Sequence, residues 1–266
     1  MEQHGGRYVS VGRRGQSVRW SGAPFGVAIA SLGLLTFIYS DSVAGLEPIP
    51  TGVSGHLGLA YVAAAVLIVG GAGIATRIET RLSAAAVATV LFVWWLLLQI
   101  PPLILHPHDG RIWTTAFETM ALSGAGCVLA SDASASGRPV QAARPMVRVG
   151  LVCFGCSVLV FGMLHLVYGD IVASLIPAWL PWHHFWAYGT GFAFLAAAAA
   201  ILSRMKAHLA AVLLGTMFGI WVLIVHSPRV ALDPANRLEW TSLLVALAMC
   251  GASWVVASVA TESSEV

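Results

Sequence analysis

The sequence predicts an all-α membrane protein with eight transmembrane helices, arranged as two parallel four-helix repeats. Composition and an internal repeat predict this fold. Hydrophobic residues make up 58% of the 266-residue chain and charged residues only 10%, and the mean hydropathy is +0.82. Soluble domains carry about 25% charged residues, so this composition is typical of a chain embedded in a bilayer.

The apolar residues fall into eight stretches, each about 20 residues long, which is the length that crosses a hydrocarbon core as a helix. We place them near 23–39, 56–76, 83–105, 113–131, 149–168, 184–203, 208–227 and 240–260. A transmembrane β-barrel would show alternating polarity instead. The continuous apolar runs at 90–98 and 195–201 do not alternate, so the spans are helices.

An internal repeat organises these helices. Residues 25–131 align with residues 154–258 at a spacing of 129, which falls to 127 after a two-residue deletion. The matched pairs include uncommon residue types: Tyr39 and Tyr168, Asp41 and Asp170, His56 and His183, Trp94 and Trp221, Pro101 and Pro228, and Trp113 and Trp240. Such a register predicts a tandem duplication. The predicted parts are an N-terminal segment (1–22), the first repeat (23–131), a linker (132–148), the second repeat (149–260) and a tail (261–266).

Basic residues predict the orientation of the helices. Eleven of the fourteen precede the first helix or lie in the second–third, fourth–fifth and sixth–seventh connections. By the positive-inside rule these segments and both termini are cytoplasmic. Each repeat then has an even number of helices, so the repeats share one orientation, as in parallel-repeat membrane proteins. The basic residues form no dense patch with interleaved aromatics, so no nucleic-acid partner is expected.

Most histidines lie at the opposite, outer ends of the helices. His165 is near the end of the fifth predicted helix, His183 and His184 open the sixth, and His226 closes the seventh. Ionisable groups at that depth are costly unless they face the bundle interior or water, so this layer is a candidate site. Histidines and aromatic residues also anchor helices at the headgroup level, and that interpretation stays open.

The two repeats differ at these positions. Thr36 stands in the first repeat where the second has His165, and Gln99 stands where the second has His226. A site is therefore expected in the second repeat, with His165, either His184 or His183, and His226 contributed by three consecutive helices. Three imidazoles could hold a transition metal or hydrogen-bond a carbonyl. Because no short ligand motif such as H-E-x-x-H is present, we assign no metal.

Two carboxylates accompany the histidines. Asp170 lies at a helix exit before the proline-containing segment 175–181. It is either a turn or cap residue or a carboxylate that orients a neighbouring histidine or receives a proton. Glu118 lies five residues into the fourth predicted helix, where the second repeat has Val245. It either relays protons or extends its carboxylate to the outer headgroups.

The second repeat carries a pattern that resembles a known family. The pattern is F-G-M-L-H at 161–165, Y-x-D at 168–170, I-P-A-W-L-P at 176–181 and W-A-Y-G-T-G at 186–191, followed by small residues and a basic turn. It is similar to the DoxX-like four-helix membrane proteins, and the first repeat resembles them more weakly. The resemblance implies a bacterial inner-membrane protein and permits a quinone or lipid-like ligand. The family's helix-end histidine corresponds to His165.

The function expected from these features is binding of a quinone or lipid-like ligand at the outer face, as part of a redox assembly. His165 and His226 would hydrogen-bond the ring oxygens, Asp170 would help move protons, and Trp186 would pack on the ligand. The chain has no evident cofactor motif, so redox chemistry would need a protein partner. The alternatives are a non-enzymatic assembly factor for another membrane complex, or a transporter. No broken helix with an intramembrane charged pair supports the transporter.

Overall fold

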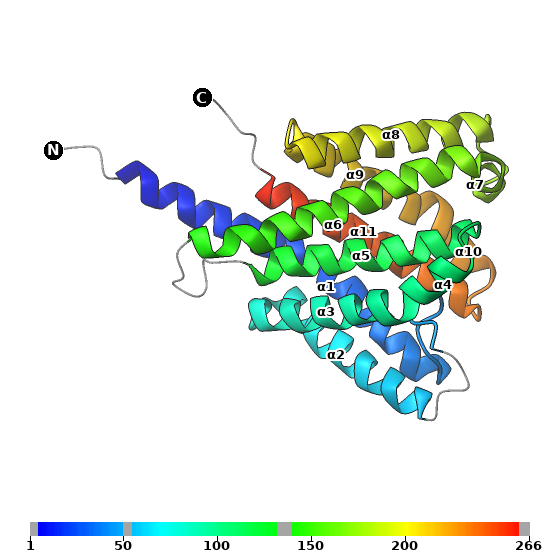
Figure 1. Ribbon diagram of the computed structural model, residues 1–266, viewed down its shortest axis with the longest axis horizontal. Helices are drawn as coiled ribbons and strands as arrows, with labels where there is room; N and C mark the ends of the chain where they lie inside the picture. The colour runs from blue at the N-terminus through cyan, green and yellow to red at the C-terminus, as the bar shows by residue number, and fades with distance from the viewer. Residues whose placement is uncertain (1–4, 50–54, 132–139, 261–266) are drawn as a thin grey trace.

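The structure, a computed structural model, describes residues 5–49, 55–131 and 140–260. Every regular element in these ranges is helical, and the long helices pack side by side with their axes roughly along the longest axis of the molecule (Figure 1). The all-α prediction is therefore confirmed. Residues 1–4 of the predicted N-terminal segment, residues 132–139 of the predicted linker and the whole predicted tail lie outside the described residues.

The first half of the chain forms α1 (Gly5–Tyr39), α2 (His56–Thr76), α3 (Thr80–Trp94), the π-helical turn η1 (Trp95–Gln99), α4 (Ile100–Leu105) and α5 (Gly110–Ala130). The second half forms α6 (Val140–Val167), α7 (Gly169–Leu175), α8 (His183–Ser203), α9 (Ala207–Trp221), the π-helical turn η3 (Val222–His226), α10 (Ser227–Leu232) and α11 (Arg237–Val259). From α2 to the start of α11, elements of the second half begin 127 residues after their counterparts, as His56 and His183 do.

Seven helical segments among the described residues are long and apolar enough to cross a membrane. They are Gly22–Tyr39, His56–Thr76, Thr80–Leu105, Pro145–Val167, His183–Ser203, Ala207–Leu232 and Arg237–Val259. The remaining predicted span, 113–131, corresponds to α5, which has 21 residues, as α2 does. Arg111, Glu118 and several hydroxyl residues make α5 less apolar, and it packs between α3, α6 and α11. Eight crossings therefore stay a prediction.

Several helix boundaries correct the sequence prediction. α1 begins at Gly5 and α6 at Val140, so helix extends into the predicted N-terminal segment and linker. Both added stretches contain arginine, which is a good helix former. The segment after Tyr168, predicted to be a turn and loop, begins with the short helix α7. The helix that contains His226 continues to Leu232, so His226 does not close it.

Prolines explain why two of the long helices widen into π-helical turns. Pro228 lies at the start of α10, directly after η3, and Pro101 lies at the start of α4, directly after η1. Proline lacks an N–H group and its ring crowds the carbonyl four residues earlier, which disturbs the regular α-helical pattern. The π turn absorbs this disturbance, and the helical course continues through both prolines.

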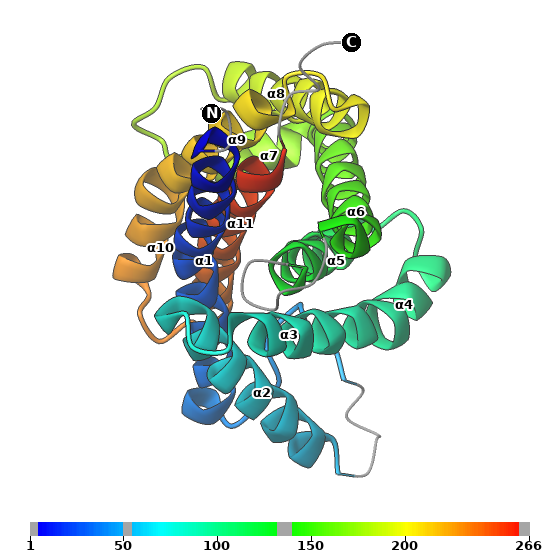
Figure 2. The ribbon, with the colours of Figure 1, turned by 90° about the vertical axis from the view of Figure 1, so that its left-hand side faces the viewer.

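Helix packing places α5 and α11 at the centre of the molecule. α5 packs against α3, α6 and α11, and α11 packs against α1, α9 and α5. α2 and α8 lie at opposite edges (Figures 1 and 2). The start of α1, the end of α11 and the α2–α3 and α8–α9 turns share one end of the bundle, whereas α4, α7 and α10 share the other (Figure 1). The candidate residues lie toward this second end.

Glycines allow the closest helix contacts. A Cβ atom on Gly71 of α2 would lie 2.4 Å from the backbone nitrogen of Ala30 in α1. A Cβ atom on Gly251 of α11 would lie 2.4 Å from the backbone nitrogen of Phe25, also in α1. α5 and α6 meet at Gly124 and Gly150, where a Cβ on Gly150 would lie 2.5 Å from the Gly124 carbonyl oxygen. Small residues at such contacts are typical of helix packing in membranes.

Candidate functional site

A cavity of about 300 Å³ lies in the second half of the molecule. Its walls come from α6, α7, α8, α9, η3, α10 and α11, and α5 and loop residues 44–46 of the first half close one side. The lining is mainly apolar and rich in aromatic side chains: Phe161, Trp186, Phe194, Phe218 and Trp221. Trp186, Leu175 and Leu238 line the cavity and are also exposed, so the cavity meets the molecular surface near them.

Four of the residues singled out from the sequence line this one cavity. His165 comes from α6, Trp186 from α8, His226 from η3 and Glu118 from α5. Glu118 belongs to the first half, although the sequence argument assigned the site to the second half alone. The packing of α5 against α6 and α11 brings it there.

Asp170 and His184 do not line the cavity. The His184 Nε2 atom lies 3.1 Å from the Asp170 Oδ1 atom, and both side chains are exposed. Together with His183 they border a shallow surface pocket. Formation of α7 accounts for this separation, because it places Asp170 in an exposed first helical turn. The predicted single site is thus split, and the proposed group of three histidines does not form.

The same separation bears on metal binding. Within the described ranges, no group of three or more His, Cys, Asp and Glu side chains is arranged to hold a metal ion.

The His165 ring is held in a defined orientation. Its Nδ1 atom lies 2.8 Å from the Phe161 carbonyl oxygen. Because a carbonyl only accepts, Nδ1 carries the hydrogen and donates it. The ring also makes an edge contact with Phe194, with ring centroids 5.1 Å apart. Nε2 has no hydrogen-bond partner among the described residues, so it is available to a ligand.

His226 lies at the end of η3, and π turns of this kind occur often at functional sites. Its Nδ1 atom is buried and has no hydrogen-bond partner among the described residues. Arg229 and Glu239 interact electrostatically with it, and the Arg229 Nη2 atom lies 2.8 Å from the Glu239 Oε1 atom. Arg229 also lines the cavity. Arg229 was not among the residues singled out from the sequence, although its position three residues after His226 puts both on one helical face.

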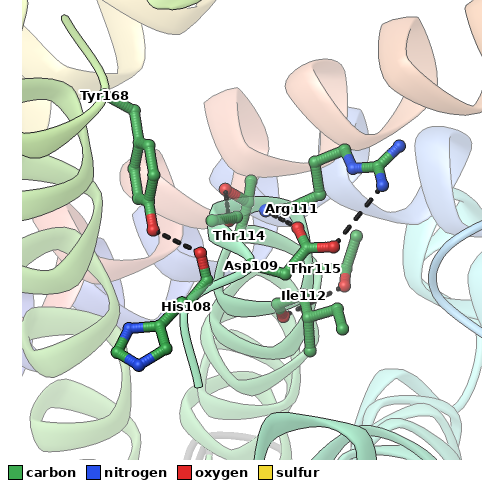
Figure 3. Close-up of polar contacts among 8 residues, drawn as sticks. His108, Asp109, Arg111, Ile112, Thr114, Thr115 and Tyr168 are labelled. Atoms are coloured by element: carbon green, nitrogen blue, oxygen red, sulfur yellow. Dashed lines mark hydrogen bonds and ion pairs between the residues drawn. The ribbon is translucent and has the colours of Figure 1, made fainter. Parts of the chain in front are cut away.

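Hydroxyl groups on α5 and α11 border the cavity with their protons already used. Thr114 donates to the Gly110 carbonyl and Thr115 to the Ile112 carbonyl (Figure 3). The Gln99 Oε1 atom is an alternative acceptor for Thr115, at 3.2 Å. On α11, Thr241 and Ser242 donate to the Arg237 and Leu238 carbonyls. Each hydroxyl has one proton, so the remaining capacity of these oxygens is to accept. Glu118 makes no hydrogen bond within the described part of the chain.

The corresponding space in the first half is filled by its own loop. Gln99, which matches His226, donates to the carbonyls of Gly45 and Leu46 at 2.8 and 3.0 Å. Val43, Leu46 and Glu47 of this loop are each only 1% exposed. Loop residues 43–47 therefore fill the space in the first half that corresponds to the cavity. In the second half, the corresponding segment forms α7 and leaves the cavity open.

Two carboxyl groups in this loop have shifted pKa values. Burial raises the pKa of Glu47 from its usual 4.5 to about 7, although the backbone N–H of Val43 partly opposes this. The negative charge of Asp41 adds to the increase. The pKa of Asp41 is itself lowered, chiefly by its hydrogen bond and ion pair with Arg237 of α11.

This ion pair joins the loop of the first half to the second half. A second contact between the halves lies near the start of α5, where the Tyr168 hydroxyl donates to the His108 carbonyl at 2.7 Å (Figure 3).

No protein-family model, curated protein or solved structure matches this chain.

Proposed function

We propose that the cavity binds a quinone or a similar lipid-like ring ligand. The observation that carries the proposal is the convergence of His165, His226, Glu118 and Trp186 on one largely apolar cavity. A few polar groups within an apolar, aromatic wall are typical of small-molecule sites. The volume of about 300 Å³ is at the lower end of the usual range, and it suits a single ring rather than a long tail.

The position of the cavity supports entry from the lipid side. Leu175, Trp186 and Leu238 combine cavity lining with exposure, so the rim is apolar. A ring ligand with an alkyl tail would place its head among the aromatic side chains and leave its tail in the bilayer. His226 would hydrogen-bond a ring oxygen, and His165 would accept a hydrogen bond from a ring hydroxyl where the ligand has one. Asp170 has no part in this site, because it borders the exposed surface pocket.

The chain would act as a DoxX-like membrane subunit of a redox assembly, with the electron-transferring cofactor on a protein partner. We further propose an inner-membrane protein with eight crossings, two parallel repeats and cytoplasmic termini. The shared spacing of 127 residues between helix starts supports the duplication. Arg77 and Arg204 support it too, because each ends its helix with a left-handed φ, of 64° and 63° respectively.

The proposal is tested by ligand binding in lipid nanodiscs. A short-tailed benzoquinone and its hydroquinone are titrated while tryptophan fluorescence is measured, because Trp186 and Trp221 line the cavity. We expect His226→Leu and Trp186→Phe to weaken binding at least tenfold, about 1.4 kcal/mol. His184→Ala is the matched control, because His184 lies outside the cavity, and it should keep the wild-type affinity.

Two results would contradict the proposal. If neither ring compound binds the wild-type protein, the cavity is not a site for this ligand class. If His184→Ala weakens binding as much as His226→Leu does, the ligand binds at the surface pocket instead. Thermal unfolding of each variant shows whether a loss of binding reflects a loss of the fold.

A further inference from the structure

We infer that the cavity selects the hydroxyl-bearing form of its ring ligand, a hydroquinone or phenol, over the quinone. The inference rests on the proposed function and deepens it, because it names the oxidation state of the ligand. It follows from the hydrogen-bonding capacity that the cavity lining has left over once the protein's own contacts are made.

His165 offers a ligand a hydrogen-bond acceptor. Its Nδ1–H group is taken by the Phe161 carbonyl at 2.8 Å, so in the neutral ring Nε2 has a lone pair and no hydrogen. Among the described residues no acidic side chain forms an ion pair with His165 to compensate a second proton. A quinone oxygen also only accepts, so it cannot hydrogen-bond to this nitrogen. A ring hydroxyl can donate to it.

Several hydroxyl groups of the lining already donate their protons within the protein. Thr114, Thr241 and Ser242 all donate to carbonyls of their own helices. The indole N–H of Trp186 donates to the Pro181 carbonyl at 3.1 Å, so this donor is used as well. The oxygens that remain accept only. The lining is therefore richer in free acceptors than its residue types suggest.

The remaining donors do not reverse this preference. Arg229 lines the cavity and keeps N–H groups beyond its contact with Glu239, and Trp221 has an indole N–H. Thr190 adds a hydroxyl that makes no hydrogen bond among the described residues, and the neutral His226 ring carries one N–H. A hydroquinone oxygen both donates and accepts, so it serves these donors and His165 at once. A quinone oxygen serves the donors alone and leaves Nε2 without a partner. Sites built to hydrogen-bond a hydroxyl reject analogues without one strongly, by up to about 10⁴–10⁵-fold.

Selective binding of the hydroquinone would change the reduction potential of the bound ligand. Tighter binding of the reduced form makes the bound quinone easier to reduce, so its midpoint potential rises. For a two-electron couple, each tenfold preference corresponds to about 30 mV. The cavity would then hold the ligand in its reduced state until a partner oxidises it.

The test compares three ligands that share one ring and one short alkyl tail: the hydroquinone, the quinone and the hydroquinone dimethyl ether. Dissociation constants are measured without oxygen in nanodiscs. For the wild-type protein we expect the hydroquinone to bind at least tenfold more tightly than the other two. His165→Phe should abolish this preference and leave quinone affinity within about threefold, which is less than 1 kcal/mol. Thr36→Val, at the matching buried position of the first half, is the control and should keep the preference.

A second variant keeps the test decisive if His165→Phe does not fold. His165→Gln presents an amide that both donates and accepts, so the ratio of affinities should fall toward one through a gain in quinone binding. Equal or tighter binding of the quinone by the wild-type protein would overturn this inference and leave the proposed function standing. Binding of none of the three ligands would overturn the proposed function itself. An unchanged preference in both His165 variants would also overturn the assignment to Nε2.

Discussion

Gln99 and His226 end equivalent π turns, but their side chains have different partners. The Gln99 amide holds two loop carbonyls, whereas the buried Nδ1 atom of His226 has no partner among the described residues. The sequence shows that Gln99 stands where the second repeat has His226, and that Thr36 stands where it has His165. The consequence of the first difference is not visible, because an amide can anchor a loop only where folding brings the loop against it. In this way one half is filled and the other retains a cavity.

Glu47 leads to a prediction about pH. The folded protein holds a proton on this carboxyl up to about pH 7, whereas the unfolded chain releases it near its usual pKa of 4.5. Between these values the folded state binds more protons, so stability falls as pH rises through this window and is flat above it. Glu47→Gln should remove this loss and raise stability at pH 8, by up to about 3 kcal/mol at 1.36 kcal/mol per pKa unit.

Thermal unfolding in detergent at pH 5 and pH 8 measures this effect. Glu79→Gln changes an exposed carboxyl on the α2–α3 turn and is the matched control, so its pH dependence should equal that of the wild type. The lowered pKa of Asp41 does not interfere, because its stabilising contribution is lost only at more acidic pH, as the pH falls through that pKa. A wild-type protein as stable at pH 8 as at pH 5 would rule out the raised pKa.

The length of a helix follows from its local sequence. The distance between two packed helices depends instead on which residue of one helix faces the other. α2 contains glycines in two different settings. At Gly71 a Cβ atom would meet the α1 backbone at 2.4 Å, and at Gly58 it would meet nothing within 4 Å. The sequence alone does not distinguish the glycine at a close helix contact from the glycine beside open space. The length of α7, by contrast, had no clear signal, since seven residues of mixed polarity are as compatible with a turn as with a helix.

These two glycines provide a paired prediction. Gly71→Ala should force α1 and α2 apart and destabilise the protein by about 1–3 kcal/mol, as overpacking does. Gly58→Ala should be neutral or stabilise by up to about 1 kcal/mol, because alanine favours the helix. Both are compared by thermal unfolding in one detergent. Equal losses for the two variants would show that α1 and α2 do not approach closely at Gly71.

The two halves of the molecule are joined by contacts between them. α1 of the first half packs against α11 of the second, and α5 of the first half packs against α6 of the second. The Asp41–Arg237 ion pair and the Tyr168–His108 hydrogen bond reinforce this arrangement at the end nearest the cavity. Glu118 lines a cavity of the second half only because α5 packs against helices of that half.

The number of membrane crossings can be tested with reporters fused to the chain. If α5 crosses the membrane, the chain makes eight crossings and a reporter fused to either terminus lies on the cytoplasmic side. A reporter inserted at His108, between α4 and α5, should then lie on the opposite side. If only the seven apolar segments cross, the termini lie on opposite sides. Paired reporters that are active only on one side of the membrane distinguish these outcomes.

The sequence by itself determined the helical fold, the extent of most long helices and the residues on which the site proposal rests. Hydrophobic length and residue type are local properties, and they set helix formation in a bilayer directly. The tertiary structure decided that His165, His226, Trp186 and Glu118 share a cavity and that Asp170 and His184 do not. It also decided that the first half is filled by its own loop. Those outcomes depend on packing between segments far apart in the chain. The histidines of the second repeat point to that half as the place of a site, but no local pattern specifies that an open space remains there.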